Sequence, residues 1–151
     1  MARIHIGVLA VTAALAACST VASDGVAFEL GAEEFHGGDK IVVEDVQSTT
    51  GGFSPGSVVT VRGSYCLASR DAGNLYFGTT TQGNKADRLG EPMGQVTVQR
   101  GTGRFELQHR VPAPGHLHVT FYDPVSAQPF GGLYFGRGES LLIAKKWAYA
   151  R

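Results

Sequence analysis

The fold is decided by two alternating stretches, RFELQHRV at residues 104–111 and HLHVTFY at residues 116–122. In each stretch the apolar side chains fall on every second residue, which is the spacing of a β-strand with one face on a hydrophobic core. Between them lies PAPG at residues 112–115, and clusters of Pro and Gly end strands and form turns. The sequence therefore predicts two strands joined by a turn.

The same pattern continues in both directions along the chain. Further β-branched or aromatic segments cover residues 40–47, 59–67, 75–81, 96–98, 133–135 and 141–147, and the segment at 96–98 is expected to turn at Gly101-Thr102-Gly103. No window combines helical spacing of apolar residues with helix caps. We therefore expect an all-β protein: an immunoglobulin-like antiparallel β-sandwich of seven or eight short strands, with a small β-barrel as the alternative.

Composition places the chain among ordinary folded domains. It has 151 residues, of which 13 are Lys or Arg and 13 are Asp or Glu, so its formal net charge is zero. Nucleic-acid binding depends on an excess of basic residues that neutralise phosphates, and this chain has no such excess. With 43% hydrophobic and only 17% charged residues, the chain is also too apolar for a disordered protein.

The N-terminus has the layout of a secretory signal. Arg3 precedes an apolar, Ala-rich run over residues 4–17, which is too short to span a bilayer permanently. The run ends in LAAC at residues 15–18, which resembles the lipobox of bacterial lipoproteins. The resemblance implies cleavage before Cys18 and attachment of diacylglyceryl and fatty acyl groups, such as palmitate, to Cys18. An ordinary secretory signal that contains a Cys is the alternative.

The lipobox also implies a location. A protein lipidated at Cys18 is attached to the membrane of the bacterial cell envelope, with its domain in the periplasm or at the cell surface. Ser19 follows the Cys where an Asp is the inner-membrane retention signal in enterobacterial lipoproteins, so we favour the outer membrane. Residues 1–17 are then a signal peptide, residues 18–39 a lipidated N-terminus and flexible tether, and residues 40–151 the folded domain.

The tether is expected because residues 19–39 mix small, acidic and Gly residues without sustained apolar spacing. Residues 26–30 alternate, however, and are compatible with a short strand. Phe28 and Phe35 are compatible with docking on the domain.

Cys66 is the one remaining thiol if Cys18 is lipidated, so no intramolecular disulfide can form. Free Cys is often buried as a small apolar side chain. We expect Cys66 to be buried and inert; a reactive or intermolecular thiol is the alternative.

Three histidines are candidates for a functional role. His116 and His118 point to one face of their strand, opposite Leu117, and a shared zinc or copper ion would need a third ligand. Candidates for that ligand are Asp123, His36 and Glu106. A solvated strand face that carries two histidines is the simpler interpretation. His109 falls on the apolar face of its strand and is expected to be a hydrogen-bonded core residue.

Other motifs give no chemistry. GFSPG at residues 52–56 matches the G-x-S-x-G of hydrolases, but Pro55 lacks the N–H that the oxyanion site requires, so we expect a turn. LYFG occurs at residues 75–78 and again at 133–136, which indicates two strands that pack in similar surroundings. GSYCLASR at 63–70 and FGGLYFG at 130–136 weakly resemble small secreted bacterial domains of unknown function.

These observations favour a non-enzymatic, lipid-anchored binding module of the cell envelope without a cofactor. Its expected partners are the membrane, through Cys18, and an envelope protein or glycan, but not nucleic acid. Tyr76, Tyr122, Tyr134 and Trp147 are candidates for a carbohydrate-stacking face, with core packing as the alternative. The alternative function is a periplasmic metal-binding protein that uses His116 and His118. A hydrolase has no supporting combination of nucleophile, base and carboxylate.

Overall fold

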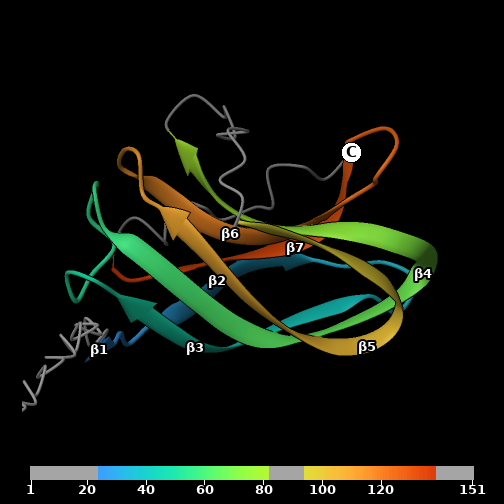
Figure 1. Ribbon diagram of the computed structural model, residues 1–151, viewed down its shortest axis with the longest axis horizontal. Coiled ribbons are helices and arrows are strands. Elements are labelled where there is room, and N and C mark those ends of the chain that lie inside the picture. Colours follow the sequence, from blue (N-terminus) through green and yellow to red (C-terminus); the bar gives the residue numbers. More distant parts are fainter. Residues whose placement is uncertain (1–23, 82–93, 139–151) are drawn as a thin grey trace, which may run out of the picture.

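The computed structural model describes residues 24–81 and 94–138, and these residues form an all-β, antiparallel fold without a helix. The strands are β1 (Asp24–Gly25), β2 (Glu29–Glu34), β3 (Lys40–Ser48), β4 (Val58–Thr81), β5 (Gln95–Arg110), β6 (Gly115–Tyr122) and β7 (Pro129–Gly136). They form one sheet in the order β1-β3-β4-β6-β7-β2, and β5 pairs with β4 outside this path. The predicted all-β class is confirmed (Figure 1).

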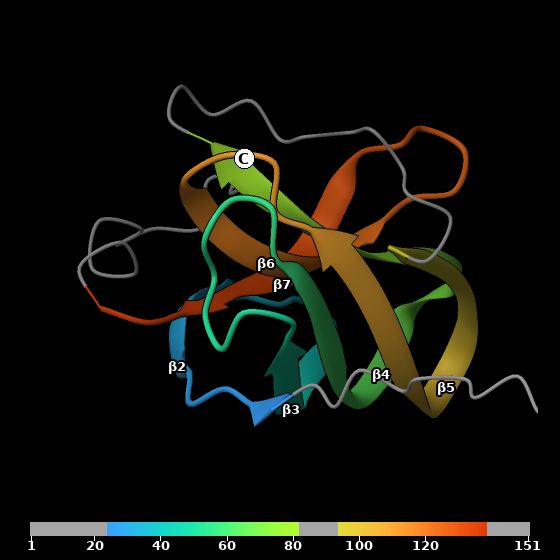
Figure 2. The ribbon, with the colours of Figure 1, turned by 60° about the vertical axis from the view of Figure 1, so that its left-hand side comes forward.

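β4 organises the sheet because it has 24 residues and pairs with three strands. Its first half pairs with β3, its second half pairs with β6, and β5 runs beside both halves. The register to β5 shifts between Leu67 and Ala72, where residues 68–71 bulge out of the ladder. Figure 2 shows β4 and β5 turning together at this bend. A bulge of this kind bends a strand and increases its twist.

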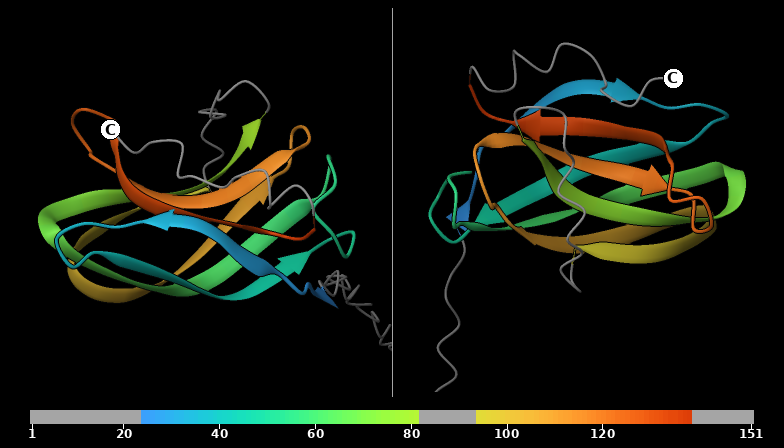
Figure 3. Two further views of the ribbon diagram at one scale, coloured as in Figure 1. Left: turned by 180° about the vertical axis from the view of Figure 1, so that it is seen from behind. Right: turned by 90° about the horizontal axis from the view of Figure 1, so that it is seen from above.

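The bend curls the sheet into a half-barrel, in which the half that contains β3 lies beneath the half that contains β6 and β7 (Figure 3). One hydrophobic core fills the space between the halves. Phe77 from β4 and Phe135 from β7 pack there with ring centroids 5.6 Å apart. The other buried core residues come from β3 to β7 and from Val111, directly after β5. Those in the strands are Ile41, Val43, Val46, Val59, Val61, Leu67, Leu75, Val98, Phe105, Leu107, Leu117, Val119, Phe121 and Leu133.

The two LYFG segments lie on either side of β6. Phe77 and Leu133 both pair with Val119 in the register, so the two copies are offset by two residues along β6. The Leu and Phe side chains of both copies are buried in the core, while Tyr76 and Tyr134 lie on the opposite face against His118. The repetition is thus explained by two neighbours of one central strand.

Three expectations about the elements need correction. Residues 59–67 and 75–81 belong to one bent strand, and the expected turn at Gly101-Thr102-Gly103 lies inside the continuous strand β5. The expected tether is part of the sheet from Asp24 onward, because β1 pairs with β3 and β2 pairs with β7. Val26 is buried, and Phe28 packs edge-to-face on Phe135 at 6.1 Å, so apolar contacts hold this segment in place.

Other expectations concern parts of the chain outside the described residues. These parts are the signal peptide with Cys18 and the strand expected at 141–147 with Trp147. Within residues 24–81 and 94–138, no helix is both long and apolar enough to cross a membrane.

Candidate functional site

The candidate site lies at the end of the sheet where β4 bends. Figure 1 shows three further features at this end: the β2–β3 connection, the turn between β6 and β7, and the region where β5 runs beside the bend. The site has two parts. The first is a clamp that fixes the bend, and the second is a small pocket beside the bend.

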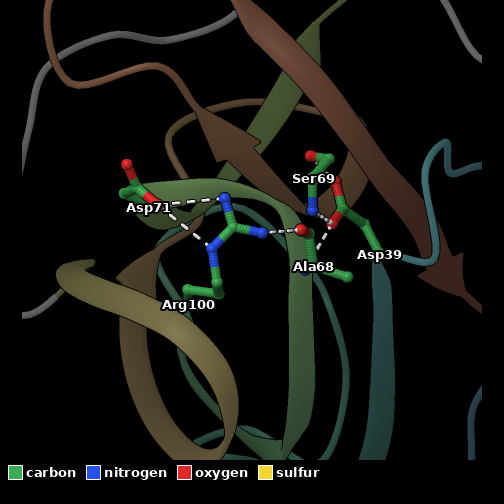
Figure 4. Close-up of polar contacts among 5 residues, drawn as sticks. All are labelled: Asp39, Ala68, Ser69, Asp71 and Arg100. Carbon is green, nitrogen blue, oxygen red and sulfur yellow. Dashed lines mark hydrogen bonds and ion pairs between the residues drawn. The ribbon is translucent and has the colours of Figure 1, made fainter.

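The clamp is the carboxylate of Asp39, which is only 5% exposed. Its Oδ1 accepts hydrogen bonds from the backbone N–H groups of Ala68 at 2.8 Å and Ser69 at 2.9 Å, and its Oδ2 accepts one from the Ser69 hydroxyl at 2.6 Å (Figure 4). Hydrogen bonds to a charged acceptor are stronger than neutral ones. Asp39 therefore provides partners for backbone groups that the bulge removes from the strand ladder.

Arg100 closes the bend from the other side (Figure 4). It stands opposite the bulge in β5, and its guanidinium donates to the Ala68 carbonyl and to Asp71 Oδ1, the latter from Nε at 3.1 Å and Nη2 at 2.9 Å. The Asp71 side chain is 96% exposed and that of Arg100 is 52% exposed. Water weakens such an ion pair, so Asp39 contributes more to the bend than Arg100 does.

The pocket has a volume of about 190 Å³ and contains two tyrosines, so we name it the tyrosine pocket. Its lining residues are Asn74, Tyr76, Gln95, Tyr122, Asp123, Pro124 and Ala127. The rings of Tyr76 and Tyr122 meet edge-to-face, with centroids 5.8 Å apart and an interplanar angle of 87°. Tyr76 is buried and Tyr122 is half-buried. This geometry is favourable for aromatic pairs and keeps both rings in place.

Asp123 fixes the turn that forms one wall of the pocket. Its Oδ1 accepts hydrogen bonds from the N–H groups of Val125 at 3.0 Å and Ser126 at 2.8 Å, and its Oδ2 accepts one from Arg70. The backbone hydrogen bonds from Ser126 and Val125 lower the pKa of Asp123, and the charge of Arg70 acts in the same direction. Asp123 is thus held as a carboxylate that is already paired.

Two further contacts stabilise this wall of the pocket. The Arg70 guanidinium lies 4.2 Å from the centroid of the Phe130 ring, a cation–π contact that ties the bend to β7. The Asp123 carbonyl accepts the N–H of Ala127 at 2.9 Å, and Ala127 has a φ of 54°. A non-glycine residue in this left-handed region is uncommon and indicates that the surrounding turn determines its conformation.

The amide of Asn74 completes the polar part of the pocket. Its Oδ1 accepts a hydrogen bond from the Thr97 hydroxyl at 2.9 Å. This bond orients the carboxamide and leaves its NH₂ group as a donor. Gln95, at the start of β5, is exposed.

The two candidate metal ligands lie on one face, opposite Leu117, as predicted, but that face is not solvated. His118 is fully buried between Tyr76 and Tyr134, with both ring centroids at 6.0 Å, and its Nδ1 lies 2.7 Å from Thr120 Oγ1. His116 is half-buried against Tyr134 at 5.9 Å. The expectation of a solvated strand face is therefore wrong, because aromatic rings flank these histidines.

The described residues provide no third ligand for this pair. Each candidate has another partner: Asp123 binds Arg70, Glu106 accepts from Arg62 Nε at 2.7 Å, and His36 lies 2.8 Å from Glu34. In residues 24–81 and 94–138 no three His, Cys, Asp or Glu side chains are grouped as a metal site would require. Zinc or copper binding by His116 and His118 therefore remains a prediction from the sequence and is not part of the function proposed below.

His109 and Cys66 complete the sequence candidates. His109 is a core residue as predicted: it is 4% exposed, its Nε2 lies 2.8 Å from Thr79 Oγ1, and its ring packs against Phe77. The partner is a threonine hydroxyl on β4, which sequence spacing does not reveal. Cys66 carries a free thiol and is half-buried rather than buried, because its face of β4 is the outer face of the sheet and Lys40 and Thr102 flank it in the register.

No family model, no curated protein and no solved structure matches this chain. The function must therefore be inferred from the chain's own residues. Sequence reasoning noted Tyr76 and Tyr122 as aromatic candidates but missed Asn74, Gln95 and Asp123 as their neighbours. The Asp123-Pro124 pair was a usable turn signal, whereas nothing in the sequence links Asp39 to Ala68.

The burial of His118 predicts that the stability of the protein depends on pH. Burial, with repulsion from His109, lowers the pKa of His118 from its ordinary value of 6.5 to about 3. Between these values the unfolded chain binds a proton that the folded protein excludes, so the stability present above pH 6.5 is lost as the pH falls. Between pH 7 and pH 5, the free energy of unfolding should fall by about 2 kcal/mol through His118 alone. His116, whose pKa burial also lowers, adds a contribution of the same sign.

Urea unfolding at pH 7 and pH 5 measures this difference. His118→Gln should remove most of the pH dependence, whereas His36→Gln should keep it, because the His36 side chain is 71% exposed. An unchanged pH dependence in His118→Gln would show that His118 is not the group that resists protonation.

Proposed function

We propose that this protein is a non-enzymatic binding module of the bacterial cell envelope, anchored by lipid on Cys18, which binds its ligand in the tyrosine pocket. The observation that supports binding is a concave site with two fixed walls, the turn held by Asp123 and the Tyr76–Tyr122 ring pair. The bend that Asp39 fixes adjoins this site. Ligand sites are usually preformed, partly aromatic and provided with a few polar groups.

The proposed anchor rests on the lipobox at residues 15–18. Each buried acyl CH₂ contributes about 0.8 kcal/mol, so the several chains of a lipoprotein hold firmly. We place the protein at the outer membrane because Ser19, not Asp, follows the Cys. The domain is then in the periplasm or at the cell surface.

The sheet pairing of β1 shortens the proposed tether. β1 begins at Asp24, so the chain between Cys18 and the sheet can extend over at most about 20 Å. The domain is therefore kept close to the membrane. β1 pairs with the end of β3 near Ser48, at the opposite end of the sheet from the β4 bend (Figure 1). With the anchor on the β1 side, the tyrosine pocket faces away from the membrane.

A binding role is preferred over catalysis because the two buried hydroxyl–histidine pairs of the described residues are inaccessible. Thr120 and His118 are 2.7 Å apart, and both are 0% exposed. Thr79 and His109 are 2.8 Å apart, as in a nucleophile and its base, but Thr79 is 0% exposed and His109 is 4% exposed within the core. No substrate can reach them without unfolding of the core. Within this proposal the immunoglobulin-like sandwich remains the finer classification, with the β3 half and the β6–β7 half as its two layers.

The anchor is tested by cell fractionation. Cys18→Ser should move the protein out of the membrane fraction, because no thiol remains for lipid attachment at that position. Cys66→Ser is the matched control and should leave the protein with the membrane. Membrane retention of Cys18→Ser equal to that of Cys66→Ser would contradict the proposed anchor.

The orientation gives a separate prediction. In the Cys66→Ser background, a fluorophore is attached to Gly25→Cys in β1 or to Val125→Cys in the turn beside the pocket. Both sites accept the change, since a Cβ at Gly25 meets nothing within 4 Å and Val125 is 96% exposed. In vesicles with a spin-labelled lipid headgroup, the label at position 25 should be quenched strongly and that at 125 weakly. Stronger quenching at 125 would place the pocket at the membrane.

A further inference from the structure

We propose that the tyrosine pocket binds a single ring of a neutral saccharide. This inference rests on the proposed binding function and names the chemical class of the ligand. The cavity of about 190 Å³ is smaller than the roughly 300–1,000 Å³ of sites for drug-sized ligands, so it is suited to one ring-sized group.

The charges around the pocket favour a neutral ligand. Among the lining residues that lie in the described parts of the chain, Asp123 is the only ionisable side chain apart from the tyrosines, and it already pairs with Arg70. A cationic ligand would compete with Arg70 for the carboxylate, and an anionic ligand would find no cation among the described lining residues. Neither kind of ion gains a free partner here.

The remaining hydrogen-bonding capacity suits hydroxyl groups. Two backbone N–H groups occupy Oδ1 of Asp123, while Oδ2 accepts from Arg70 and retains one lone pair. Asn74 offers its NH₂ group, since Thr97 occupies its oxygen, and the Gln95 amide offers both a donor and an acceptor. A hydroxyl both donates and accepts, so a ring with several hydroxyls can use this mixed set.

The aromatic part of the pocket suits the other face of such a ring. Sugar rings carry C–H bonds beside their hydroxyls and pack against aromatic side chains through that apolar surface. Tyr122 is half-buried and its ring is held by Tyr76, so it loses little conformational entropy when a ligand covers it.

A peptide is less well suited to this pocket. Peptides commonly bind by adding a strand to an unpaired sheet edge. Asn74, Tyr76 and Tyr122 all lie on strands whose register is paired on both sides: Asn74 with Thr97 and Tyr122, and Tyr122 also with Pro129. These three positions therefore offer side chains to a ligand but no free backbone edge. Gln95 differs from them, because β5 pairs only with β4 among the described strands.

The test is calorimetric titration of the full-length mature chain, purified in a detergent without a sugar headgroup. The neutral probes are cellotriose and triacetylchitotriose at millimolar concentration; glucuronate and tetraglycine represent a charged sugar and a peptide. We expect at least one neutral trisaccharide to bind. Gln95→Ala and Asn74→Ala should each weaken its affinity about tenfold by removing a hydrogen bond.

Gln99→Ala is the matched control, because Gln95 and Gln99 are both exposed amides on β5 and Gln99 does not line the pocket. Equal loss of affinity in Gln95→Ala and Gln99→Ala, or no binding of either trisaccharide, would overturn the inference. Binding of tetraglycine alone, weakened by Gln95→Ala, would overturn the saccharide class, and binding of glucuronate alone would overturn the neutral charge of the ligand; either result would keep the proposed binding function. Unfolding midpoints identical to that of the parent chain verify that each variant is folded.

Discussion

The buried carboxylate of Asp39 is the constraint on which the rest of the structure depends. It accepts hydrogen bonds from Ala68 and Ser69 at the point where β4 leaves its ladder with β5, so the bulge has partners for its backbone groups. Because β4 bends there, its two halves can pair with different strands and enclose one core. Close packing also requires Gly63, where a side chain would collide with the Val42 carbonyl and the Phe105 ring.

The sequence predicted what local alternation determines and missed what distant contacts determine. The strands at 104–111 and 116–122, the core position of His109 and the turn before β4 were predictable, since each depends on spacing or on Pro and Gly. The continuity of β4 and β5 was not, because the bend is held by contacts between residues distant in sequence: Asp39, just before β3, binds Ala68, and Arg100 in β5 binds the Ala68 carbonyl. Residues 24–34 were expected in a tether for the same reason: β7, which pairs with β2, is about a hundred residues away.

The candidate site depends on the same bend. Arg70 lies in the bulge of β4. It donates a hydrogen bond to Asp123 and packs on the Phe130 ring, so the turn beside the tyrosine pocket is attached to β4. Asn74 and Tyr76 follow directly in β4 and reach the pocket because the strand has changed direction before them. The sequence indicated Tyr122 as a candidate for a carbohydrate-stacking face, with core packing as the alternative. Its polar neighbours come from β4, β5 and the β6–β7 turn and could not be assembled from spacing.

The most direct test of this account is amide hydrogen exchange combined with urea unfolding of Asp39→Ala and Asp71→Ala. Asp39→Ala leaves the N–H groups of Ala68 and Ser69 without their acceptor, so the account predicts a loss of about 2–4 kcal/mol in the free energy of unfolding and faster exchange at both amides. Asp71→Ala, at a 96% exposed side chain, should change stability by less than about 1 kcal/mol. Equal effects of the two substitutions, or unchanged exchange at Ala68 and Ser69 in Asp39→Ala, would contradict it.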